Sequence, residues 1–180
     1  MNTTHALVIG ARGVGKSTLI RRVLDELGQP VFGFETKKED SLADGQLGSP
    51  VYLYPAGAVH RRTPENLAAH CGIHGFHAYR PVFDRYALRL NAPIPTDRVI
   101  LMDELGFLEA VSDAFCGAVL HLLDGDIPVI AAVKDRDTPF LNAVRSHPNC
   151  KHFFITSENR DALFHEVLYF MRTQTARRGR

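Results

Sequence analysis

The sequence contains few cysteines, no long apolar run and almost no net charge. Its three cysteines show no repeating spacing, which argues against a disulfide framework and favours a reducing compartment. No apolar run approaches the roughly 18 residues of a membrane-spanning helix, and the first residues, MNTTHALVIGA, lack the basic region of a signal peptide. A net charge of +1 provides no overall field for nucleic acid. These absences predict a soluble cytoplasmic protein with no membrane partner and no clear nucleic-acid surface.

The composition is that of a folded domain, with 45% hydrophobic and 23% charged residues. At 180 residues the chain is long enough to bury one core of ordinary size. We expect a single domain over residues 1–172, with a variable, lid-like segment at about 56–80. The basic tail, 173–180, is expected to fray.

Apolar strand-like runs alternate with helical patterns along the chain. This alternation predicts an α/β fold with a mainly parallel sheet and helices on both faces. Two neighbouring runs, 31–36 and 51–55, are joined by a polar, glycine-containing stretch and are expected to pair as a hairpin. The pattern over 56–79 favours neither strand nor helix. Strands are expected at 5–10, 31–36, 51–55, 97–104, 127–133 and 152–156, and helices at 16–28, 81–90, 109–125, 139–146 and 158–172.

The stretch GARGVGKST, residues 10–18, matches the phosphate-binding pattern G-x-x-x-x-G-K-[ST] between a predicted strand and a predicted helix. Its glycines allow turns that a Cβ would block, so that successive N–H groups can face one anion. The N-terminus of the helix adds positive potential. Lys16 is expected to reach the β- and γ-phosphates, and the Ser17 hydroxyl to bind Mg²⁺. The predicted nucleotide-binding residues are Gly10, Ala11, Arg12, Gly13, Val14, Gly15, Lys16, Ser17 and Thr18.

Two adjacent carboxylates, Asp103 and Glu104, follow the apolar run VILM. A phosphate-binding loop needs an acidic residue on a neighbouring strand to position Mg²⁺, and Asp103 is the candidate. Glu104 is expected to point to the other side of the pleat, where it can orient or deprotonate a water near the γ-phosphate. The alternative is that Glu104 caps the next segment or pairs with a nearby arginine. A water base within the site favours hydrolysis over transfer to a bulky acceptor.

Four motifs occur in order along nearly the whole chain: GARGVGKST (10–18), GFET (33–36), DELGFLE (103–109) and TSENRDAL (156–163). With these motifs the chain resembles the P-loop nucleoside-triphosphatase family that includes thermophilic bacterial and archaeal NTPases and the human cancer-related NTPase. The resemblance implies a RecA-like parallel sheet. It also implies Mg²⁺-dependent hydrolysis of nucleoside triphosphates with loose base preference.

Asn159 and Arg160 match the N-R positions of that family, at the start of the last predicted helix. They could line the base or ribose pocket of a nucleotide. Alternatively, they cap the helix and pair locally.

The sequence departs from the family pattern at two places. After G-F-x-T the family has an acidic residue and an arginine, whereas this chain has KKED, with Lys38 and Asp40 near those positions. After D-E-x-G the family's Lys-Met pair is replaced by Phe107 and Leu108, although Glu109 is retained. A phosphate contact made by the family's cation is therefore either relocated or lost in this chain.

A cation is needed to neutralise the charge that develops on the γ-phosphoryl oxygens. The segment VKDRDTP follows a predicted strand, so its cations are expected at the carboxyl edge, where ligands bind in such sheets. We favour Arg136 for this role, and the alternative is a solvated loop charge. The segment does not match the guanine-binding pattern N-K-x-D, so strict guanine specificity is not expected. The cations considered are Arg12, Lys37, Lys38, Lys134 and Arg136.

The stretch HCGIHGFH gathers His70, Cys71, His74 and His77. Imidazole and thiolate groups are transition-metal ligands, but this spacing is not that of a known zinc module. The sequence therefore leaves two interpretations open, a metal site and a mobile, partly exposed surface segment without metal.

The motifs together predict a Mg²⁺-dependent nucleoside-triphosphatase with Ser17 and Asp103 at the metal and with Glu104, Lys16 and Arg136 as the catalytic residues. The first alternative is a small-molecule kinase on the same scaffold, with Glu104 as base on an acceptor hydroxyl and the lid-like segment as acceptor site. The second alternative is a nucleotide-driven accessory protein that hydrolyses slowly and acts through a protein partner. In that case the His/Cys segment would serve as a docking or metal-sensing surface.

Overall fold

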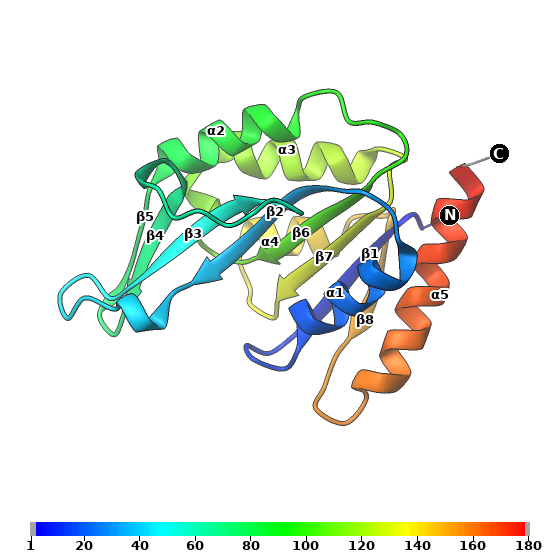
Figure 1. The fold of residues 1–180 in the computed structure, drawn as a ribbon, viewed down its shortest axis with the longest axis horizontal. Helices are drawn as coiled ribbons and strands as arrows, with labels where there is room; N and C mark the ends of the chain where they lie inside the picture. The colour runs from blue at the N-terminus through cyan, green and yellow to red at the C-terminus, as the bar shows by residue number, and fades with distance from the viewer. Residues whose placement is uncertain (1–2, 179–180) are drawn as a thin grey trace.

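Eight strands form one sheet in the order β5-β4-β3-β2-β6-β7-β1-β8 (Figure 1). The computed structural model describes residues 3–178. The strands are β1 (His5–Gly10), β2 (Val31–Lys38), β3 (Ser49–Pro55), β4 (Leu67–Gly72), β5 (Gly75–Ala78), β6 (Val99–Leu105), β7 (Val129–Lys134) and β8 (Cys150–Phe154). The helices are α1 (Lys16–Leu27), α2 (Arg80–Leu90), α3 (Asp113–Asp124), α4 (Pro139–Arg145) and α5 (Arg160–Arg178). The short 3₁₀ turns are η1 (Asp40–Leu42), η2 (Pro64–Asn66) and η3 (Glu109–Val111).

The strands β2, β6, β7, β1 and β8 run parallel to one another. Most of their residues are buried, which explains the nearly continuous apolar runs ALVI in β1 and VILM in β6. Strand β7 lies between β1 and β6 and separates the strand before the phosphate-binding loop from the strand that carries Asp103 and Glu104. The predicted α/β fold with a mainly parallel sheet is confirmed.

Strands β3, β4 and β5 extend the sheet beyond β2 by antiparallel pairing. The predicted hairpin of 31–36 with 51–55 is confirmed as the β2–β3 pair. Strands β4 and β5 lie in the segment 56–80, which the sequence pattern leaves unassigned, so much of this segment belongs to the sheet. The pattern gives no strand signal over β5 because this edge strand is largely exposed and has no apolar face to alternate with a polar one.

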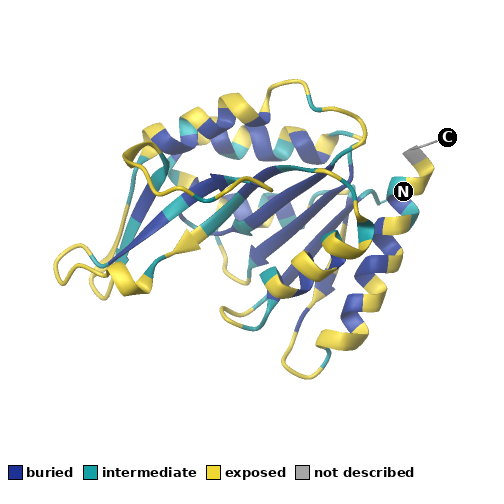
Figure 2. Cartoon of the chain, viewed as in Figure 1, coloured by how far each residue is buried: buried dark blue, intermediate teal, exposed yellow. Residues whose placement is uncertain are grey.

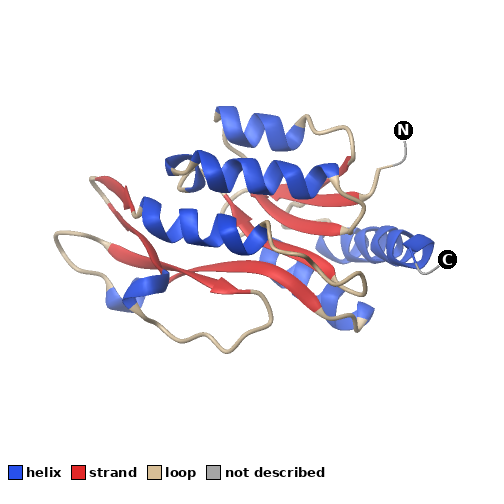
Figure 3. Cartoon of the chain, turned by 90° about the horizontal axis from the view of Figure 1, so that it is seen from above, coloured by secondary structure: helices blue, strands red, loops and turns tan. Residues whose placement is uncertain are grey.

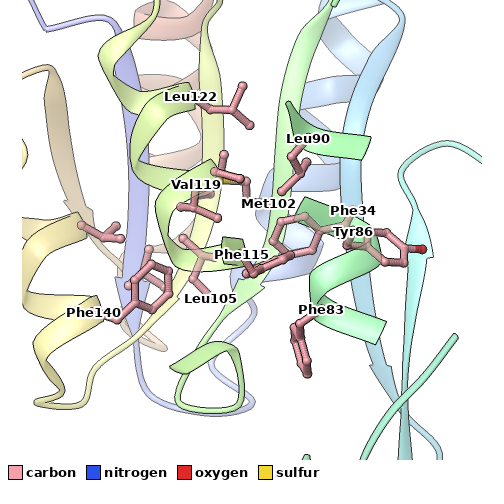
Figure 4. Packing of buried hydrophobic residues seen from close by; sticks show 14 of the residues in the cluster. Phe34, Phe83, Tyr86, Leu90, Met102, Leu105, Phe115, Val119, Leu122 and Phe140 are labelled. Atoms are coloured by element: carbon pink, nitrogen blue, oxygen red, sulfur yellow. The ribbon is translucent and has the colours of Figure 1, made fainter. Parts of the chain in front are cut away.

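Helices α2, α3 and α4 cover one face of the sheet, and α1 and α5 cover the other (Figure 3). In the first core, Phe115 of α3 lies between Phe34 of β2 and Phe83 of α2, with ring centroids 5.2 and 5.4 Å apart (Figure 4). In the second core, Val23 of α1 and Val167 of α5 are both fully buried. Each such side chain contributes about 1.5–3 kcal/mol of transfer free energy. Burial is concentrated in the central strands, whereas the tips beyond β3, β4 and β5 are exposed (Figure 2).

The helix expected at 109–125 begins four residues later than its apolar pattern, at Asp113. The Ser112 hydroxyl accepts a hydrogen bond from the Phe115 N–H at 3.1 Å and caps the first turn. The preceding residues form the 3₁₀ turn η3 instead. The apolar spacing identifies the helix, but the capping serine decides where it starts.

The last helix continues through Arg178, so the fraying expected for the basic tail is wrong over 173–178. Met171 and Gln174 are buried near this end of α5 and pack it against the rest of the molecule. Gly179 and Arg180 lie outside the described residues. Within residues 3–178, no helix combines the length and apolar character that crossing a bilayer requires.

Candidate active site

The carboxyl ends of β1, β6 and β7 lie at one edge of the sheet because these strands run parallel. The phosphate-binding loop follows β1, Asp103 and Glu104 lie near the end of β6, and Lys134 ends β7. Gly10 pairs with Lys134 in the β1–β7 ladder, so the loop begins directly beside Lys134. The structure thus brings together the residues that the motifs assign to phosphate, metal and water.

The phosphate-binding loop turns sharply between β1 and α1. Gly13 and Gly15 take positive φ angles of 76° and 105°, which side chains with a Cβ rarely adopt. Lys16 begins α1 and is only 5% exposed. Its ammonium donates hydrogen bonds to the Gly10 and Ala11 carbonyls, both at 2.9 Å. The glycines of the pattern are therefore required by the backbone that surrounds the lysine.

Ser17 and Asp103 lie in contact at the start of α1. The Ser17 hydroxyl donates a hydrogen bond to Asp103 Oδ1 at 2.8 Å. Burial raises the pKa of the Asp103 carboxyl to about 6, and within the described part of the chain no lysine or arginine forms an ion pair with it. A hydroxyl and a buried carboxylate without a neutralising cation fit Mg²⁺, which prefers oxygen ligands and completes its shell with water and phosphate.

Glu104 lies between two lysines. Its Oε1 is 3.0 Å from Lys16 Nζ, and its Oε2 is 3.5 Å from Lys134 Nζ. The carboxylate is thus beside the lysine that is expected to bind the γ-phosphate, and its ion-pair partners are lysines of the site rather than an arginine. This position is compatible with the predicted contact to an attacking water.

Glu109, to which the sequence motif assigns no role, is 2% exposed beside the same edge. Burial raises the pKa of its carboxyl to about 7, although Oε2 accepts a hydrogen bond from the Gly106 N–H at 2.9 Å. A Cβ on Gly106 would lie 3.2 Å from Lys134 Nζ and 3.5 Å from Glu109 Oε2. Gly106 therefore leaves the space in which the lysine and the buried glutamate approach each other.

The motif GFET contains a glycine that lets β2 approach β6 closely and a further carboxylate near Asp103. Gly33 has a φ of 119°, and a Cβ there would lie 2.0 Å from the Leu101 carbonyl oxygen, so only glycine allows β2 this contact with β6. Glu35 pairs in register with Asp103, and His60 Nε2 lies 3.7 Å from Glu35 Oε2. Glu35 is a site residue that sequence reasoning missed. Its position in the shared motif was the available signal.

The KKED departure still contacts the phosphate-binding loop. Asp40 Oδ1 lies 2.7 Å from Lys38 Nζ and accepts a hydrogen bond from the Ser49 hydroxyl at 2.8 Å, and Asp40 Oδ2 is 3.8 Å from Arg12 Nη2. The hydrogen bond from Lys38 is the main cause that lowers the pKa of the Asp40 carboxyl. Ser49 is buried, but Arg12 and Asp40, which make the contact with the loop, are largely exposed, so this contact positions the loop weakly.

Phe107, which stands at the family's lysine position, gathers two cations from the end of β7. Lys134 Nζ lies 5.1 Å from the centre of its ring, and the Arg136 guanidinium lies 5.3 Å from it. The Phe76 ring of β5 packs on Phe107 with centroids 4.8 Å apart. The predicted catalytic cation, Arg136, thus lies near the site, but Lys134 contacts the site's carboxylate.

Asn159 and Arg160 have different surroundings at the start of α5. The Asn159 side chain accepts a hydrogen bond from the Thr156 N–H at 2.8 Å and donates one to the Phe154 carbonyl at 2.8 Å. These bonds favour the local capping interpretation for Asn159. Arg160 lies against the phosphate-binding loop, where a Cβ on Gly15 would be 3.5 Å from its Nε. A nucleotide contact is therefore a stronger prediction for Arg160 than for Asn159.

The histidines and cysteine of HCGIHGFH do not converge. Among the described residues no group of three or more His, Cys, Asp or Glu side chains is arranged to hold a metal ion. His70 Nδ1 instead lies 3.1 Å from the Tyr79 hydroxyl, and the His77 ring packs edge-on against Tyr79. His70 and His77 pair directly across β4 and β5 and share one face, whereas Cys71 points to the other. The structure therefore shows no joint ligand set for this segment within the described residues, and the metal site stays an untested prediction.

A cavity of about 310 Å³ lies between α1 and the face of β2 and β6, beside Ser17 and Asp103. Its apolar floor includes Leu101, and Arg21 and Glu35 contribute polar groups to its wall. Ser17 and Asp103 lie at its border. The volume is at the lower end of the range for small-molecule sites.

Because β7 intervenes between the loop strand and the carboxylate strand, the fold and site are those of a RecA-like P-loop NTPase. Within that class the assignment can be made at the level of the family. A family model described as NTPase matches residues 5–168, and the chain therefore belongs to this NTPase family. The predictions of a nucleoside-triphosphatase family and of an enzyme are confirmed.

Relatives match over almost their full length. The chain is 28% identical to "Nucleoside-triphosphatase THEP1" of Thermotoga petrophila, with 92% of each chain covered. It is 29% identical to "Cancer-related nucleoside-triphosphatase homolog" of Bos taurus, covering 94% of this chain and 97% of the relative. The crystal structure of THEP1 from Aquifex aeolicus matches with a TM-score of 0.71 at 22% identity, over 93% of this chain and 98% of that one, which shows the shared fold.

Proposed function

We propose that the protein hydrolyses nucleoside triphosphates to the diphosphate and phosphate, with Mg²⁺ and with little selection of the base. The observation that carries this proposal is the position of Glu104, 3.0 Å from the buried lysine of the phosphate-binding loop. The names of the relatives support the same reaction. The absence of an N-K-x-D match after β7 supports loose base selection.

Substrate binding uses groups that are already in place. The loop amides and Lys16 bind the β- and γ-phosphates, and Arg160 approaches from the start of α5. Ser17 and Asp103 would hold Mg²⁺, which would neutralise charge on the phosphate oxygens. As Lys16 turns to the phosphates it leaves Glu104, whose carboxylate becomes free to accept a hydrogen bond from water.

The chemical step is an in-line displacement. Glu104 accepts a proton from the attacking water, the water oxygen bonds to the γ-phosphorus, and the bond from that phosphorus to the β–γ bridging oxygen breaks. The products are nucleoside diphosphate and inorganic phosphate, and the proton on Glu104 then returns to solvent. Arg136 remains a predicted contributor to charge stabilisation.

The test is phosphate release from ATP, GTP, CTP and UTP with Mg²⁺, comparing the intact protein with Glu104→Gln. We expect several nucleotides to be hydrolysed and the variant to lose about 100- to 10,000-fold in kcat while still binding nucleotide. Glu166→Gln, an exposed change of the same chemistry on α5, serves as the matched control. Equal turnover in intact protein and Glu104→Gln would show that Glu104 is not the base.

The cavity beside Ser17 and Asp103 favours one second candidate, a small-molecule kinase. An acceptor hydroxyl in this space would be near the same phosphate, with Glu104 as its base. A kinase would form ADP from ATP without an equal amount of inorganic phosphate once a hydroxyl compound is added. Parallel measurement of ADP and phosphate with a panel of nucleosides therefore separates the two reactions.

A further inference from the structure

We propose that Lys134 is the catalytic cation that stabilises the charge on the transferring γ-phosphoryl group. Glu104 holds its ammonium in position until the nucleotide binds. This inference rests on the proposed hydrolysis and names the residue that carries out one part of it. The sequence places Lys134 and Arg136 together at the carboxyl edge of the sheet and does not show which of the two contacts the phosphoryl group.

The backbone places Lys134 between the two halves of the site. Strand β7 lies between β1 and β6, and its last residue, Lys134, pairs with Gly10 at the start of the phosphate-binding loop. On the other side of β7, Val133 pairs with Leu105, one residue after Glu104. A side chain that leaves the sheet at this point faces the space above both the loop and the water base.

Glu104 lies between two ammonium groups of the site. The carboxylate contacts both Lys16 Nζ, at 3.0 Å, and Lys134 Nζ, at 3.5 Å. One oxygen of the carboxylate faces each ammonium group, so Glu104 holds the two lysines at one place. An incoming phosphate is therefore attracted to the position that the carboxylate holds, and both lysines can turn to its oxygens.

The Lys134 ammonium is held by its surroundings. It lies over the Phe107 ring at 5.1 Å, an arrangement that attracts a cation without neutralising it. Gly106 leaves room for the ammonium, since a Cβ there would lie 3.2 Å from Nζ. Preorganisation of this kind avoids the cost of moving a donor during the reaction.

The backbone of the β7–α4 loop is fixed by Arg145 of α4. Its Nη1 donates to the Lys134 carbonyl at 3.3 Å, and its Nη2 donates to the Arg136 carbonyl at 2.8 Å. The same Nη2 lies 3.1 Å from Asp137 Oδ1. Arg145 is therefore a positioning residue that holds the end of β7 against the site.

Arg136 is less well placed for the same role. It follows β7 in an exposed loop, and its guanidinium stacks on Phe107 at 5.3 Å. Within the described residues it forms no ion pair, whereas Lys134 contacts the water base directly. The geometry assigns the first position at the phosphoryl group to Lys134.

The experiment compares Lys134→Met and Lys134→Arg with the intact protein in steady-state hydrolysis of Mg-ATP. Lys151→Met is the matched control, because Lys151 also lies over a phenylalanine, Phe153 at 5.0 Å, but near the amino end of β8. We expect Lys134→Met to lower kcat by about 100- to 1,000-fold with little change in KM, and Lys134→Arg to recover part of the loss. The control should match the intact protein.

A second readout is the affinity for Mg-ADP with and without fluoroaluminate, which imitates the transferring phosphoryl group. We expect fluoroaluminate to tighten ADP binding in the intact protein and not in Lys134→Met, while binding of ADP alone stays within about threefold. Lys134→Gln repeats the measurement should the methionine variant fail to fold by circular dichroism.

Unchanged kcat in Lys134→Met, or equal fluoroaluminate tightening in both proteins, would overturn the assignment. Failure of the proposed function is separate, because it would show as absent phosphate release by the intact protein. In that case the fluoroaluminate comparison still decides for or against Lys134.

Discussion

At the amino end of β1, His5 is fully buried and both of its ring nitrogens form hydrogen bonds. Its Nε2 donates to the Leu123 carbonyl at 2.9 Å, and its Nδ1 accepts from the Val129 N–H at 3.2 Å. At the carboxyl end of the neighbouring strands, Asp103 is also buried, but its hydrogen-bond partner is a single hydroxyl, that of Ser17. The two ends therefore bury polar groups for different purposes. A group with every partner in place stabilises the fold, whereas one with spare capacity is available to a ligand.

The carboxyl end is tested first, through Asp103→Asn. Removing the charge should raise the Mg²⁺ concentration for half-maximal hydrolysis by about 10- to 100-fold, since Asp103 would supply the carboxylate that positions the ion. The free energy of unfolding without Mg²⁺ should not fall, because a buried carboxylate with no cation has been removed. Mg²⁺ titration and urea unfolding measure the two quantities, with exposed Asp161→Asn as control. An unchanged Mg²⁺ curve would contradict the metal site.

At the amino end, His5→Gln should change the pH dependence of stability and leave the Mg²⁺ dependence of hydrolysis unchanged. Burial lowers the pKa of His5 from 6.5 to about 4. The folded state thus binds fewer protons than the unfolded state, so this stabilisation is complete above pH 6.5 and is lost as pH falls towards 4. Over that pH range the free energy of unfolding of the intact protein should fall by about 3 kcal/mol more than that of the variant.

Urea unfolding at pH 7.5, 5.5 and 4.5 measures this difference, because titration of all other groups cancels between the two proteins. Mg²⁺-dependent hydrolysis at pH 7.5 should be unchanged in His5→Gln. Parallel pH profiles of stability would show that His5 does not titrate as its burial requires. Altered Mg²⁺ dependence would break the distinction between the two ends.

A smaller effect of opposite sign is expected for Glu109→Gln. Burial raises the pKa of Glu109 from 4.5 to about 7, so the folded state binds more protons than the unfolded state. This contribution to stability is complete below pH 4.5 and is lost as pH rises to 7. The variant should therefore gain stability relative to the intact protein between pH 5 and pH 8.

The gain between pH 5 and pH 8 should be about 2 kcal/mol, less than the full pKa shift indicates, because part of the contribution is already lost at pH 5. Differential urea unfolding at the two pH values measures it. A variant that is less stable than the intact protein at pH 8 would show that the ionised carboxylate is stabilised by Lys134 more than its burial costs.

The parts of the fold that sequence predicted correctly are those with a strong local period. Continuous apolar runs such as ALVI predict fully buried strands, and apolar residues at helical spacing, as in α1, predict amphipathic helices. The strands β4 and β5 carry no such pattern, because β5 is a short, exposed edge strand and the two fully buried residues of β4, Ala68 and Ala69, are adjacent rather than alternating. The tail was misjudged for a related reason: its arginines suggested solvent, while burial of Gln174 keeps it helical.

The residues of the site likewise fall into those that the sequence predicted and those that it did not. Gly13, Gly15 and Lys16 were predictable because their roles depend on residues next to them in the sequence. The roles of Glu35 and Glu109 depend instead on residues distant in the sequence, Asp103 for Glu35 and Lys134 for Glu109. No spacing rule within one segment contains that information.

By itself, then, the sequence determined the phosphate-binding turn, the pair Asp103 and Glu104, and the alternation of strands and helices. Only the tertiary structure decided that β7 would lie between β1 and β6, which sets Lys134 beside Gly10 and next to Glu104. The physical reason is the range of the interactions. Turns and helices are set by neighbours a few residues away, whereas strand order is settled by burial and pairing between segments that are distant in the chain.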